Sequence, residues 1–382
     1  MTRLVYLSPV RWGSFEQRPH KFVRWFHGRT QAEVLWLDPY HTRFPRLADL
    51  ARWQRTCSAS APTLPPTWLH VVKPSALPIE PLPVAAHVNR VLWGGLLAEV
   101  SRFAEAGQTL LVIGKPSLLA SQVLAVLDSC ASVYDAMDDF PSFYAGLARR
   151  GMHRRERQVA SRVDAVWASS YALQQRLAQQ YGAVQLVPNG LDPALMPAAR
   201  SRHRASPLVF GYVGTMASWF DWDVVIALAH IRQSDRICLI GPVNTPPAVA
   251  LPANVDVHPP LPHDQALAAM REFDVGLIPF KRNRLTAAVD PIKYYEYRAL
   301  DLPVLSTDFG EMSRRRGQPG VHLIDAISDL ATGALQAAMD DTALDADFAQ
   351  RHCWDAVFDA AKLPASELGA DWALTTTPTA AL

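Results

Sequence analysis

The sequence has few cysteines and no excess of either charge. Four cysteines are spread over 382 residues, none of them in a Cys-x-x-Cys pair: Cys57, Cys130, Cys238 and Cys353. This pattern is typical of a reducing compartment, and it excludes a disulfide framework and the usual ligand spacing of a zinc site. Lysine and arginine number 37 against 36 aspartates and glutamates, a net charge of +1. Without a basic excess, the composition gives no support to a nucleic-acid-binding protein.

Long hydrophobic runs are also missing. The N-terminal stretch MTRLVYLSP has an early basic residue and then only a short apolar run, so it lacks the apolar core and the small-residue cleavage site of a secretory signal. No uncharged apolar stretch reaches the ~18 residues that a membrane-spanning helix needs. We therefore expect a cytoplasmic protein that is soluble or in peripheral contact with the inner face of the cytoplasmic membrane.

What the sequence does contain is enough apolar material for two domains. The apolar fraction is 49%, so a buried core is available and disorder is not expected. A length of 382 residues exceeds what one ordinary hydrophobic core serves. Short apolar runs alternate with longer helical patterns, which is typical of βαβ units and a parallel sheet. We expect an α/β fold with two domains.

The first series of βαβ units occupies the N-terminal half of the chain. Its apolar runs are short and continuous, as expected of strands that are buried on both faces. The expected strands are residues 4–7, 34–37, 110–113, 132–134, 165–168 and 184–187, and the expected helices are residues 18–27 and 117–127.

A turn segment with the sequence PNGLD, residues 188–192, separates this series from a second one. The expected strands of the second series are residues 208–213, 237–240, 255–258, 275–278 and 304–306, and its expected helices are residues 221–231, 265–272 and 292–300, with further helices between 328 and 358. The predicted domains are residues 1–198 and 199–345, followed by helices at 346–368 that cross back to the first domain and a flexible tail at 369–382.

The most specific stretch is DPIKYYEYRALDLPVL, residues 290–305. A helix that opens after Asp290 and Pro291 presents unpaired N–H groups, beginning at Ile292, and a partial positive charge to an anion. Lys293 adds a full charge for a diphosphate. Glu296 lies on the same face and can accept hydrogen bonds from ribose hydroxyls. The alternative is an ordinary amphipathic helix with solvated charges.

With the segments around it, this stretch resembles the GT-B glycosyltransferases, and among them the bacterial enzymes of exopolysaccharide and teichuronic acid assembly. The resemblance covers most of the chain and rests on the order and spacing of several segments rather than on any one of them. They are QRPHK (17–21), YDAMDDF (134–140), VPNGLD (187–192), GYVGTMASWFD (211–221), IGP (240–242), DVGLIPFKRNRLTAAVDPIKYYEY (274–297) and LPVLST (302–307).

The resemblance implies two Rossmann-like domains that face each other across a cleft, with the acceptor on the N-terminal domain and the donor on the C-terminal one. It implies transfer of a sugar from a nucleoside-diphosphate sugar, with UDP-sugars favoured, to a glycan or polyprenyl-diphosphate-linked acceptor in surface polysaccharide synthesis. The sugar nucleotide is a substrate and no cofactor is implied. No bound metal is expected, because Lys293 and the helix dipole neutralise the leaving diphosphate and the sequence has no His/Asp cluster with metal-ligand spacing.

Three further residues are expected at the donor. Gly214 and Thr215 end the strand of GYVGT, where a glycine lets a diphosphate approach backbone amides closely. Tight packing of the strand against a helix is the alternative for Gly214. Lys281 follows the strand at 275–278 on its carboxyl edge, where ligands bind in such sheets, and is a second candidate phosphate contact.

The YDAMDDF segment follows a strand of the first domain, so we expect its acidic residues at the carboxyl edge of that sheet. An acceptor hydroxyl must lose its proton as it attacks the anomeric carbon, and a carboxylate can serve as the general base. In the related xanthan glucuronosyltransferase pattern, the base falls at Asp138. Asp135 and Asp139 are expected as structural neighbours, with Asp139 also a candidate acceptor contact. The alternative is that Asp138 and Asp139 cap a helix that starts near Pro141.

His20 is the rival general base, and a surface histidine beside Arg18 is the alternative interpretation. Trp12 and Arg18 are candidate acceptor contacts, although a core position explains Trp12 equally well. Large retaining GT-B families carry two glutamates eight positions apart around the donor helix. Here Ala288 stands eight residues before Glu296, which favours inversion by direct displacement.

The stretch HTRFPRLADLARWQR, residues 41–55, is basic, and as a helix it would separate apolar from basic side chains. Such a helix can rest on an anionic lipid surface, which would suit a lipid-linked acceptor. The alternative is a helix packed on the sheet of its own domain.

Two other functions fit the same layout. A non-hydrolysing UDP-sugar epimerase would interconvert sugar nucleotides without an acceptor, and an inactive binding or scaffold protein would keep the fold without turnover. A scaffold would tolerate substitution of Asp138, whereas a transferase should lose turnover and keep donor binding. An NAD-dependent dehydrogenase is disfavoured, because no G-x-G-x-x-G follows the first expected strand.

Overall fold

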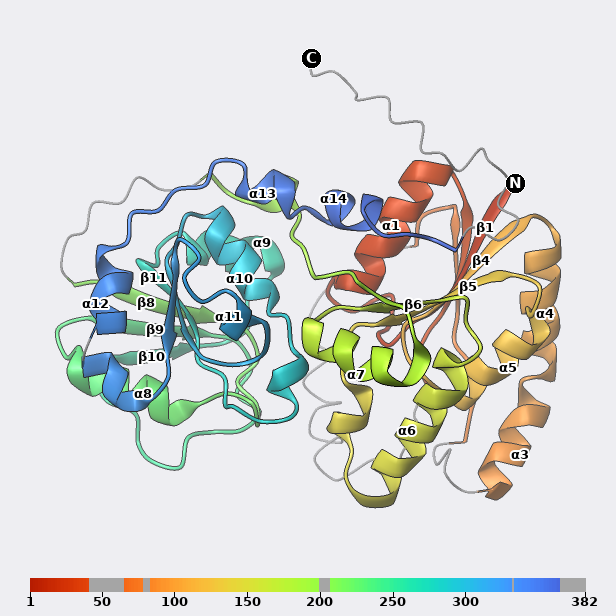
Figure 1. The fold of residues 1–382 in the computed structure, drawn as a ribbon, viewed down its shortest axis with the longest axis horizontal. Helices are drawn as coiled ribbons and strands as arrows, with labels where there is room; N and C mark the ends of the chain where they lie inside the picture. The colour runs from red at the N-terminus through yellow and green to blue at the C-terminus, as the bar shows by residue number, and fades with distance from the viewer. Residues whose placement is uncertain (41–64, 78–82, 199–206, 332, 365–382) are drawn as a thin grey trace, which may run out of the picture. The chain divides into compact units, whose positions relative to one another are not determined.

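The computed structural model describes residues 1–40, 65–77, 83–198, 207–331 and 333–364, and the basic stretch at 41–55 lies outside these ranges. The chain forms two compact units. Unit 1 contains Met1–Ala168, Gln174–Leu186 and the chain from Ala361, and unit 2 contains Ser169–Leu173 and Val187–Ala360. Each unit is built on one sheet of parallel strands with helices packed against it (Figure 1), which confirms the α/β class.

The sheet of unit 1 has the strand order β3-β2-β1-β4-β5-β6-β7, and its neighbouring strands pair in parallel. Residues 4–7 of β1 and 110–113 of β4 are buried, continuous apolar runs, and β5 is buried along its whole length, as a sheet covered on both faces requires. The strands are β1 (Thr2–Leu7), β2 (Glu33–Leu37), β3 (Leu69–Val72), β4 (Gln108–Ile113), β5 (Ala131–Ala136), β6 (Ala165–Ala168) and β7 (Val184–Leu186).

Helices connect the strands of unit 1 and cover both faces of its sheet. From β1 the chain moves to β2 in one direction, and from β4 onward it moves in the other, so right-handed crossovers place α1 and α5 on opposite faces. Phe22 of α1 packs against Tyr6 of β1 and Trp167 of β6, with ring centroids 5.8 and 5.7 Å apart. The helices are α1 (Arg18–Thr30), α3 (Pro83–Leu92), α4 (Gly94–Glu105), α5 (Leu118–Val126), the 3-10 turn η1 (Phe140–Phe143), α6 (Gly146–Ala160) and α7 (Tyr171–Tyr181).

The sheet of unit 2 has the strand order β10-β9-β8-β11-β12-β13, and it is also parallel. Its strands are β8 (Val209–Val213), β9 (Arg236–Ile240), β10 (Val255–His258), β11 (Val275–Ile278), β12 (Val304–Thr307) and β13 (Val321–Ile324). One hydrophobic core joins these strands to the helices around them.

The direction of the chain reverses between β8 and β11, because β8 leads to β9 on one side while β11 leads to β12 on the other. Ligands of open α/β sheets bind outside the carboxyl ends of the strands at such a switch point. The helices of unit 2 are α8 (Trp222–Ile231), α9 (His263–Met270), α10 (Ile292–Ala299), α11 (Gly310–Arg314), α12 (Gly333–Asp340), α13 (Phe348–Arg351) and α14 (Trp354–Asp359), with 3-10 turns η2 (Pro193–Leu195), η3 (Thr286–Ala288) and η4 (Ile327–Ala331).

The units divide the chain between Leu186 and Val187, earlier than the boundary at 198/199 that the sequence predicts. The turn segment at 187–192 groups with unit 2 because it pairs with the chain near α13. The N–H of Leu191 donates to the carbonyl of His352 over 3.0 Å, and Leu191 forms an isolated parallel bridge with Cys353.

The C-terminal helices α13 and α14 belong to unit 2, and the chain returns to unit 1 after α14. There Lys362 accepts a hydrogen bond on its carbonyl from Trp167 Nε1 (3.3 Å) and donates its N–H to Gln185 Oε1 (2.8 Å). No helix in the described ranges combines the length and the apolar composition that crossing a lipid bilayer would require.

Candidate functional site

The carboxyl edge of the unit 2 sheet carries the donor-binding residues that the sequence predicts. Gly214 follows β8 directly, and Lys281 follows β11 after a short turn, so the two residues stand on either side of the switch point. Lys281 is exposed, and its ammonium group has no hydrogen bond or ion pair within the described ranges. Its backbone N–H donates to the carbonyl of Trp219 over 2.7 Å, which holds this loop beside the loop after β8.

Two glycines let the backbones at this edge approach each other. Gly241 follows β9 with φ 143°, and a Cβ atom at this position would lie 2.1 Å from the carbonyl oxygen of Gly214. Gly214 has φ 156°, and its N–H donates to the carbonyl of Ile240 over 2.9 Å. Thr215 is half-buried, and its carbonyl accepts a hydrogen bond from the Tyr212 hydroxyl (3.2 Å). The glycines therefore keep the end of the sheet free of side chains, as an approaching diphosphate would need.

Helix α10 begins at Ile292 and presents its N-terminus at the same edge. Pro291 has no N–H, and the N–H groups of Ile292 and Lys293 donate to no residue of the described chain. The side chains of Lys293 and Glu296 form an ion pair one turn apart, with Glu296 the more deeply buried of the two. Free amides, a helix dipole and a lysine are groups that can bind an anion.

The last turn of α10 is fixed to the end of β8 by Tyr297. Its hydroxyl accepts a hydrogen bond from the N–H of Val213 (3.2 Å), and the side chain is fully buried. This contact ties α10 to the strand that ends at Gly214. The predicted donor residues of α10 and of the GYVGT strand therefore belong to one rigid region of unit 2.

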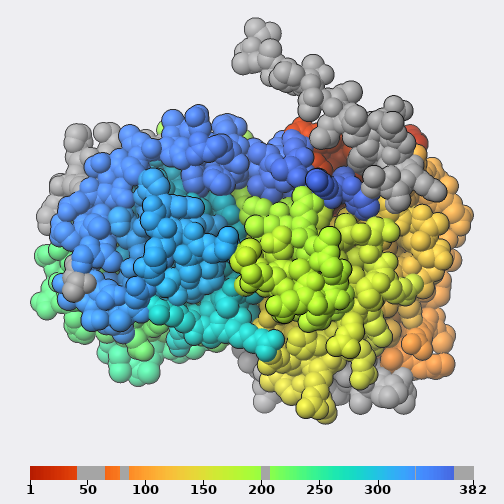
Figure 2. All heavy atoms as spheres, in the orientation of Figure 1, coloured from red at the N-terminus to blue at the C-terminus, as the bar shows by residue number. Residues whose placement is uncertain are grey.

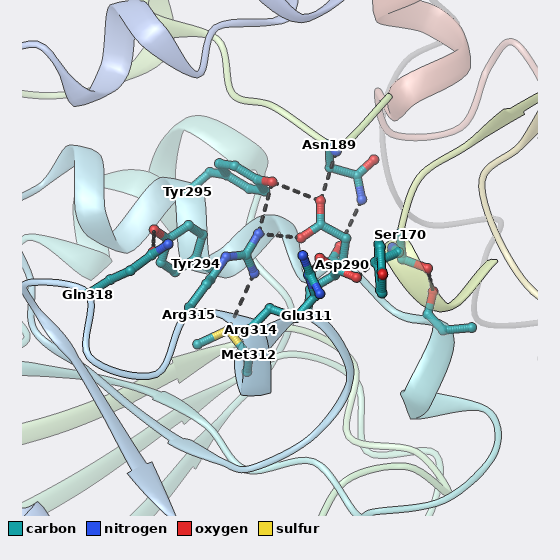
Figure 3. Close-up of polar contacts among 12 residues, drawn as sticks. Ser170, Asn189, Asp290, Tyr294, Tyr295, Glu311, Met312, Arg314, Arg315 and Gln318 are labelled. Atoms are coloured by element: carbon teal, nitrogen blue, oxygen red, sulfur yellow. Dashed lines mark hydrogen bonds and ion pairs between the residues drawn. The ribbon is translucent and has the colours of Figure 1, made fainter. Parts of the chain in front are cut away.

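Asp290 has a different role from the one the sequence predicts. Its carboxylate is fully buried and is shared by Arg315 (Nη2 to Oδ1, 2.6 Å), the hydroxyl of Tyr295 (2.8 Å to Oδ2) and the N–H of Asn189 (2.8 Å to Oδ2). Figure 3 shows these groups converging on the carboxylate. Arg315 also stacks on Tyr294, with its guanidinium carbon 3.8 Å from the ring centroid. Because the carboxylate is fully buried and is held by three donors of the protein, Asp290 fixes the start of α10.

Residues 169–173 hold the loop before α10 from another side. The Ser170 hydroxyl donates to the carbonyl of Ala288 (2.9 Å), and the N–H of Tyr171 donates to Glu311 Oε1 (2.6 Å). Burial raises the pKa of Glu311, and the hydrogen bond from Tyr171 opposes that shift. Sequence reasoning missed Arg315, Asn189 and Glu311 as positioning residues, and no local pattern marks them, because each acts on a partner far away in the chain.

Asp138 lies just after β5 of unit 1, where the sequence predicts the general base. The residue is half-buried, and its carboxylate accepts no hydrogen bond from the described chain. Burial raises the pKa of Asp138 to about 7; the charge of Arg18 opposes this rise, and the carboxylates of Asp139 and Asp135 add to it. A free carboxylate with a pKa near neutrality suits proton abstraction.

The raised pKa of Asp138 means that its ionised carboxylate destabilises the folded state above neutral pH. The carboxyl group ionises near pH 4 in the unfolded chain and near pH 7 in the folded one, so stability falls as pH rises between these values and is level above them. At about pH 8.5, we expect the free energy of unfolding of Asp138→Asn to exceed that of the wild type by on the order of 2 kcal/mol, so that the variant unfolds at a higher temperature. This difference should vanish near pH 4. Thermal melts across this pH range test it, and a difference that does not change with pH would contradict it.

Arg18 is a structural residue and not the acceptor contact that the sequence predicts. Its side chain and that of Asp135 are each only 1% exposed. The guanidinium donates to both oxygens of Asp135, from Nε (3.1 and 3.0 Å) and from Nη2 (2.9 Å). This bidentate pair joins α1 to β5 in the core of unit 1, because a buried charge needs a close partner.

His20 is a poor candidate for the rival general base. Its ring is 1% exposed, and both nitrogens are used: Nδ1 accepts from the N–H of Gln17 (3.1 Å), so Nε2 carries the proton and donates to the carbonyl of Trp12 (3.1 Å). Burial lowers the pKa of His20, which keeps the ring neutral. The histidine caps the first turn of α1, and the surface position given as the alternative is wrong as well.

The side chains of Trp12 and Asp139 are also buried and make contacts within unit 1. Trp12 is 9% exposed; it packs edge-on against Trp36 (5.2 Å between centroids), and its N–H donates to Asp38 (2.9 Å), so it takes the core position. Asp139 is buried; it accepts a hydrogen bond from the Ser142 hydroxyl and forms an ion pair with Arg176 (3.4 Å). Its side chain makes no cap to η1. Of the predicted acceptor-side residues, Asp138 alone keeps a carboxylate available to a ligand.

Within the described ranges, no three His, Cys, Asp or Glu side chains come together in a way that could hold a metal ion.

No protein-family model matches the chain. A curated relative, the putative teichuronic acid biosynthesis glycosyltransferase TuaH of Bacillus subtilis, is 23% identical over 205 residues, which is 48% of this chain and 51% of the relative. The match thus spans about half the length of that protein.

Solved structures resemble the chain over nearly its whole length. Anabaena HepE in complex with UDP-glucose has a TM-score of 0.61 and 15% identity, and covers 94% of this chain and 97% of its own. The lipopolysaccharide outer core galactosyltransferase WaaB has a TM-score of 0.60 and 11% identity, with 94% and 98% covered. Likeness at this identity establishes the fold, and this chain has the two Rossmann-like domains of the GT-B fold.

Proposed function

We propose that this protein transfers a sugar from a nucleoside-diphosphate sugar, preferably a UDP-sugar, to a glycan or lipid-linked acceptor in surface polysaccharide synthesis. The observation that carries the proposal is the start of α10, where two unpaired N–H groups and Lys293 face the carboxyl edge of the sheet in a GT-B fold. The matched half of TuaH, described as a putative teichuronic acid biosynthesis glycosyltransferase, and the UDP-glucose complex of HepE support the reaction class and the nucleotide.

The donor binds to unit 2 in this proposal. Its diphosphate accepts hydrogen bonds from the amides of Ile292 and Lys293 and replaces Glu296 as the ionic partner of the lysine. Glu296 is then able to accept hydrogen bonds from the ribose hydroxyls. Gly214, Thr215 and Lys281 border the same edge and surround the phosphates. Asp290 and Arg315 hold the helix N-terminus in place without touching the donor.

The transfer itself needs one base and one leaving group. Asp138 takes the proton of the acceptor hydroxyl as the oxygen forms a bond to the anomeric carbon, and the bond from that carbon to the diphosphate breaks on the other side, with inversion. The nucleoside diphosphate leaves with the electron pair, and its charge is neutralised by Lys293 and the α10 dipole. Since these groups supply the positive charge, we propose that no metal ion is required. We further propose that the enzyme works in the cytoplasm, peripherally at the membrane if its acceptor is lipid-linked.

A panel of sugar nucleotides tests the donor. We expect one UDP-sugar, and free UDP, to raise the melting temperature of the wild type in buffer with EDTA, because a ligand that binds only the folded state stabilises it. We expect Lys293→Gln to weaken the affinity for that donor by roughly 10- to 100-fold, the value of a hydrogen bond to a charged group. Lys73→Gln removes an exposed lysine of unit 1 and should change nothing.

Three outcomes would contradict the proposal. If neither nucleotide sugars nor free UDP and GDP shift the melting temperature, the chain is not a sugar-nucleotide enzyme. If the donor is converted to its epimer without any acceptor, the protein is an epimerase. A donor that binds but is never turned over by any glycan or lipid-linked acceptor would indicate an inactive binding protein.

A further inference from the structure

The sheet of unit 1 has a switch point of its own between β1 and β4. These strands are neighbours, and β1 leads to β2 on one side while β4 leads to β5 on the other. The N–H of Gly114 donates to the carbonyl of Leu7 (2.8 Å) and the N–H of Ser8 to that of Leu37 (3.0 Å), so the ends of these strands are held side by side. Helices cover the faces of the sheet, and Figure 2 shows the atoms of α6 and α7, in yellow and yellow-green, packed over unit 1. A ligand of unit 1 is therefore expected at the carboxyl ends of β1 and β4.

A small hollow opens at this point, which we call the β1/β4 hollow. The space that the centre of a water molecule can occupy in it is about 20 Å³, which is room for one or two water-sized groups and not for a sugar ring. The hollow therefore fits small groups at the edge of a larger ligand. Apolar side chains make part of its wall, and its polar lining residues are Ser8, Asp38, Tyr40, Lys115 and Ser117.

Asp38, the residue after β2, brings a carboxylate oxygen without a donor to the β1/β4 hollow. Its side chain is only 6% exposed. Oδ1 accepts hydrogen bonds from the N–H of Trp12 and from Nε1 of Trp36, both 2.9 Å long, and these two contacts fix the orientation of the carboxylate. Oδ2 accepts no hydrogen bond from a described residue. Because buried polar atoms in proteins are paired, Oδ2 requires a donor from a ligand or from water.

Lys115 and Ser8 bring hydrogen-bond donors to the same lining. Lys115 comes two residues after β4 and is half-buried, and its ammonium group forms no ion pair or hydrogen bond with a described residue. Ser8 is 4% exposed; its Oγ accepts from the N–H of Val10 (3.1 Å), and its own proton goes to no described acceptor.

The two charged residues of the lining have opposite signs. An anion in the β1/β4 hollow would meet the carboxylate of Asp38, and a cation would meet the ammonium group of Lys115. A sugar hydroxyl both donates and accepts, so two neighbouring hydroxyls satisfy the carboxylate oxygen and the lysine together. The chemistry of the lining thus favours a neutral diol.

We propose that the β1/β4 hollow holds two neighbouring hydroxyls of the acceptor, so that the acceptor is a glycan with a free diol and not a bare lipid phosphate. One hydroxyl donates to Asp38 Oδ2, and the other accepts from Lys115. Asp138 follows β5, which pairs with β4 at the spacing of about 4.8 Å between neighbouring strands. A sugar ring that is anchored here by its diol therefore lies near the proposed base. This inference rests on the proposed transferase function and names the acceptor class within it.

Binding of simple glycosides to the full-length protein tests the proposal without a donor. We expect saturation-transfer NMR titrations to show binding of at least one of the methyl glycosides of glucose, galactose and mannose. Asp38→Asn and Lys115→Gln should each weaken it by roughly 10- to 100-fold, the value of a hydrogen bond to a charged group. The asparagine keeps an Oδ1 acceptor for Trp12 and Trp36, and thermal melts establish that each variant is folded. Lys73→Gln removes an exposed lysine of the same unit and should bind like the wild type.

Deoxy analogues of the glycoside identify the hydroxyls. An analogue without one hydroxyl of the diol should bind the wild type more weakly than the parent glycoside does. The analogue that lacks the hydroxyl on Asp38 should lose nothing further in Asp38→Asn, because the variant and the analogue remove the same hydrogen bond.

Several results would overturn the proposal. If none of the three glycosides binds the wild type, or if both variants bind them as the wild type does, the β1/β4 hollow is not a diol site. Inorganic phosphate that binds more tightly to Asp38→Asn than to the wild type would make it an anion site, because removing the carboxylate helps an anion and harms a diol. Either result can occur while sugar nucleotides still raise the melting temperature, so the proposed function would stand. Glycoside binding that depends on Asp38, in a protein that no sugar nucleotide stabilises, would support the diol site and contradict the transferase.

Discussion

Asp138→Asn should reduce turnover by roughly 100- to 10,000-fold and leave the donor dissociation constant unchanged. The amide cannot accept the proton of the acceptor hydroxyl, but it fills the same space and leaves unchanged unit 2, where we propose that the donor binds. Initial rates with a saturating acceptor, together with calorimetric titration of the donor, measure the two effects separately.

The pH profile distinguishes a base from a structural carboxylate. Asp138 must be ionised to accept a proton, and its pKa is about 7, so kcat/KM of the wild type should fall tenfold per pH unit below about pH 7. The residual rate of Asp138→Asn should lack this limb. Asp128→Asn changes an exposed aspartate of the same unit and should keep both the rate and the profile. A fully active Asp138→Asn variant would remove this residue from the mechanism.

Arg18→Met should destabilise the protein by about 3–5 kcal/mol, because it leaves the carboxylate of Asp135 buried without its partner. In denaturant titrations, we expect the transition of unit 1 to move to a much lower midpoint. The variant should also raise the pKa of Asp138, since the charge of Arg18 opposes the effect of burial there. The acid limb of the residual activity should then lie at a higher pH than in the wild type.

A second substitution separates the loss of a partner from the loss of packing. The double variant R18M/D135L removes both charges, and we expect it to recover much of the stability that Arg18→Met loses. Arg24→Met removes the exposed ion pair with Glu16 from the same helix and should cost less than about 1 kcal/mol. If Arg18→Met costs no more than Arg24→Met, the buried pair does not stabilise unit 1.

Strands and helices with strong periodicity could be predicted from the sequence. The continuous apolar run at 110–113 predicts β4, and the run at 275–278 predicts β11, because strands buried on both faces consist mainly of apolar residues. Strands β3 and β13 were missed. Both are only four residues long and contain a histidine, so they show neither a continuous apolar run nor a clear alternation.

Helix α6 was missed for a different reason. Its arginines fill half of the exposed positions and leave a narrow apolar stripe, so the composition looks like that of a solvated loop. The buried Glu156 interrupts that stripe further, and it is tolerated only because Arg176 of α7 is its partner. A pattern within α6 could not indicate this pairing.

The sequence by itself determined two series of βαβ units and the helix start at which Lys293 and Glu296 lie one turn apart, because strand burial and helix geometry depend on residues that are neighbours in the chain. The GT-B architecture was implied by the resemblance of its motifs to that family. Only the tertiary structure decided which charged side chains are free. Arg18 and Asp290 were predicted to contact substrates, but folding places each beside a charge from a distant segment, Asp135 and Arg315. Burial penalises an unpaired charge, so these groups bind each other. Asp138 has no such partner in the described chain, and burial raises its pKa.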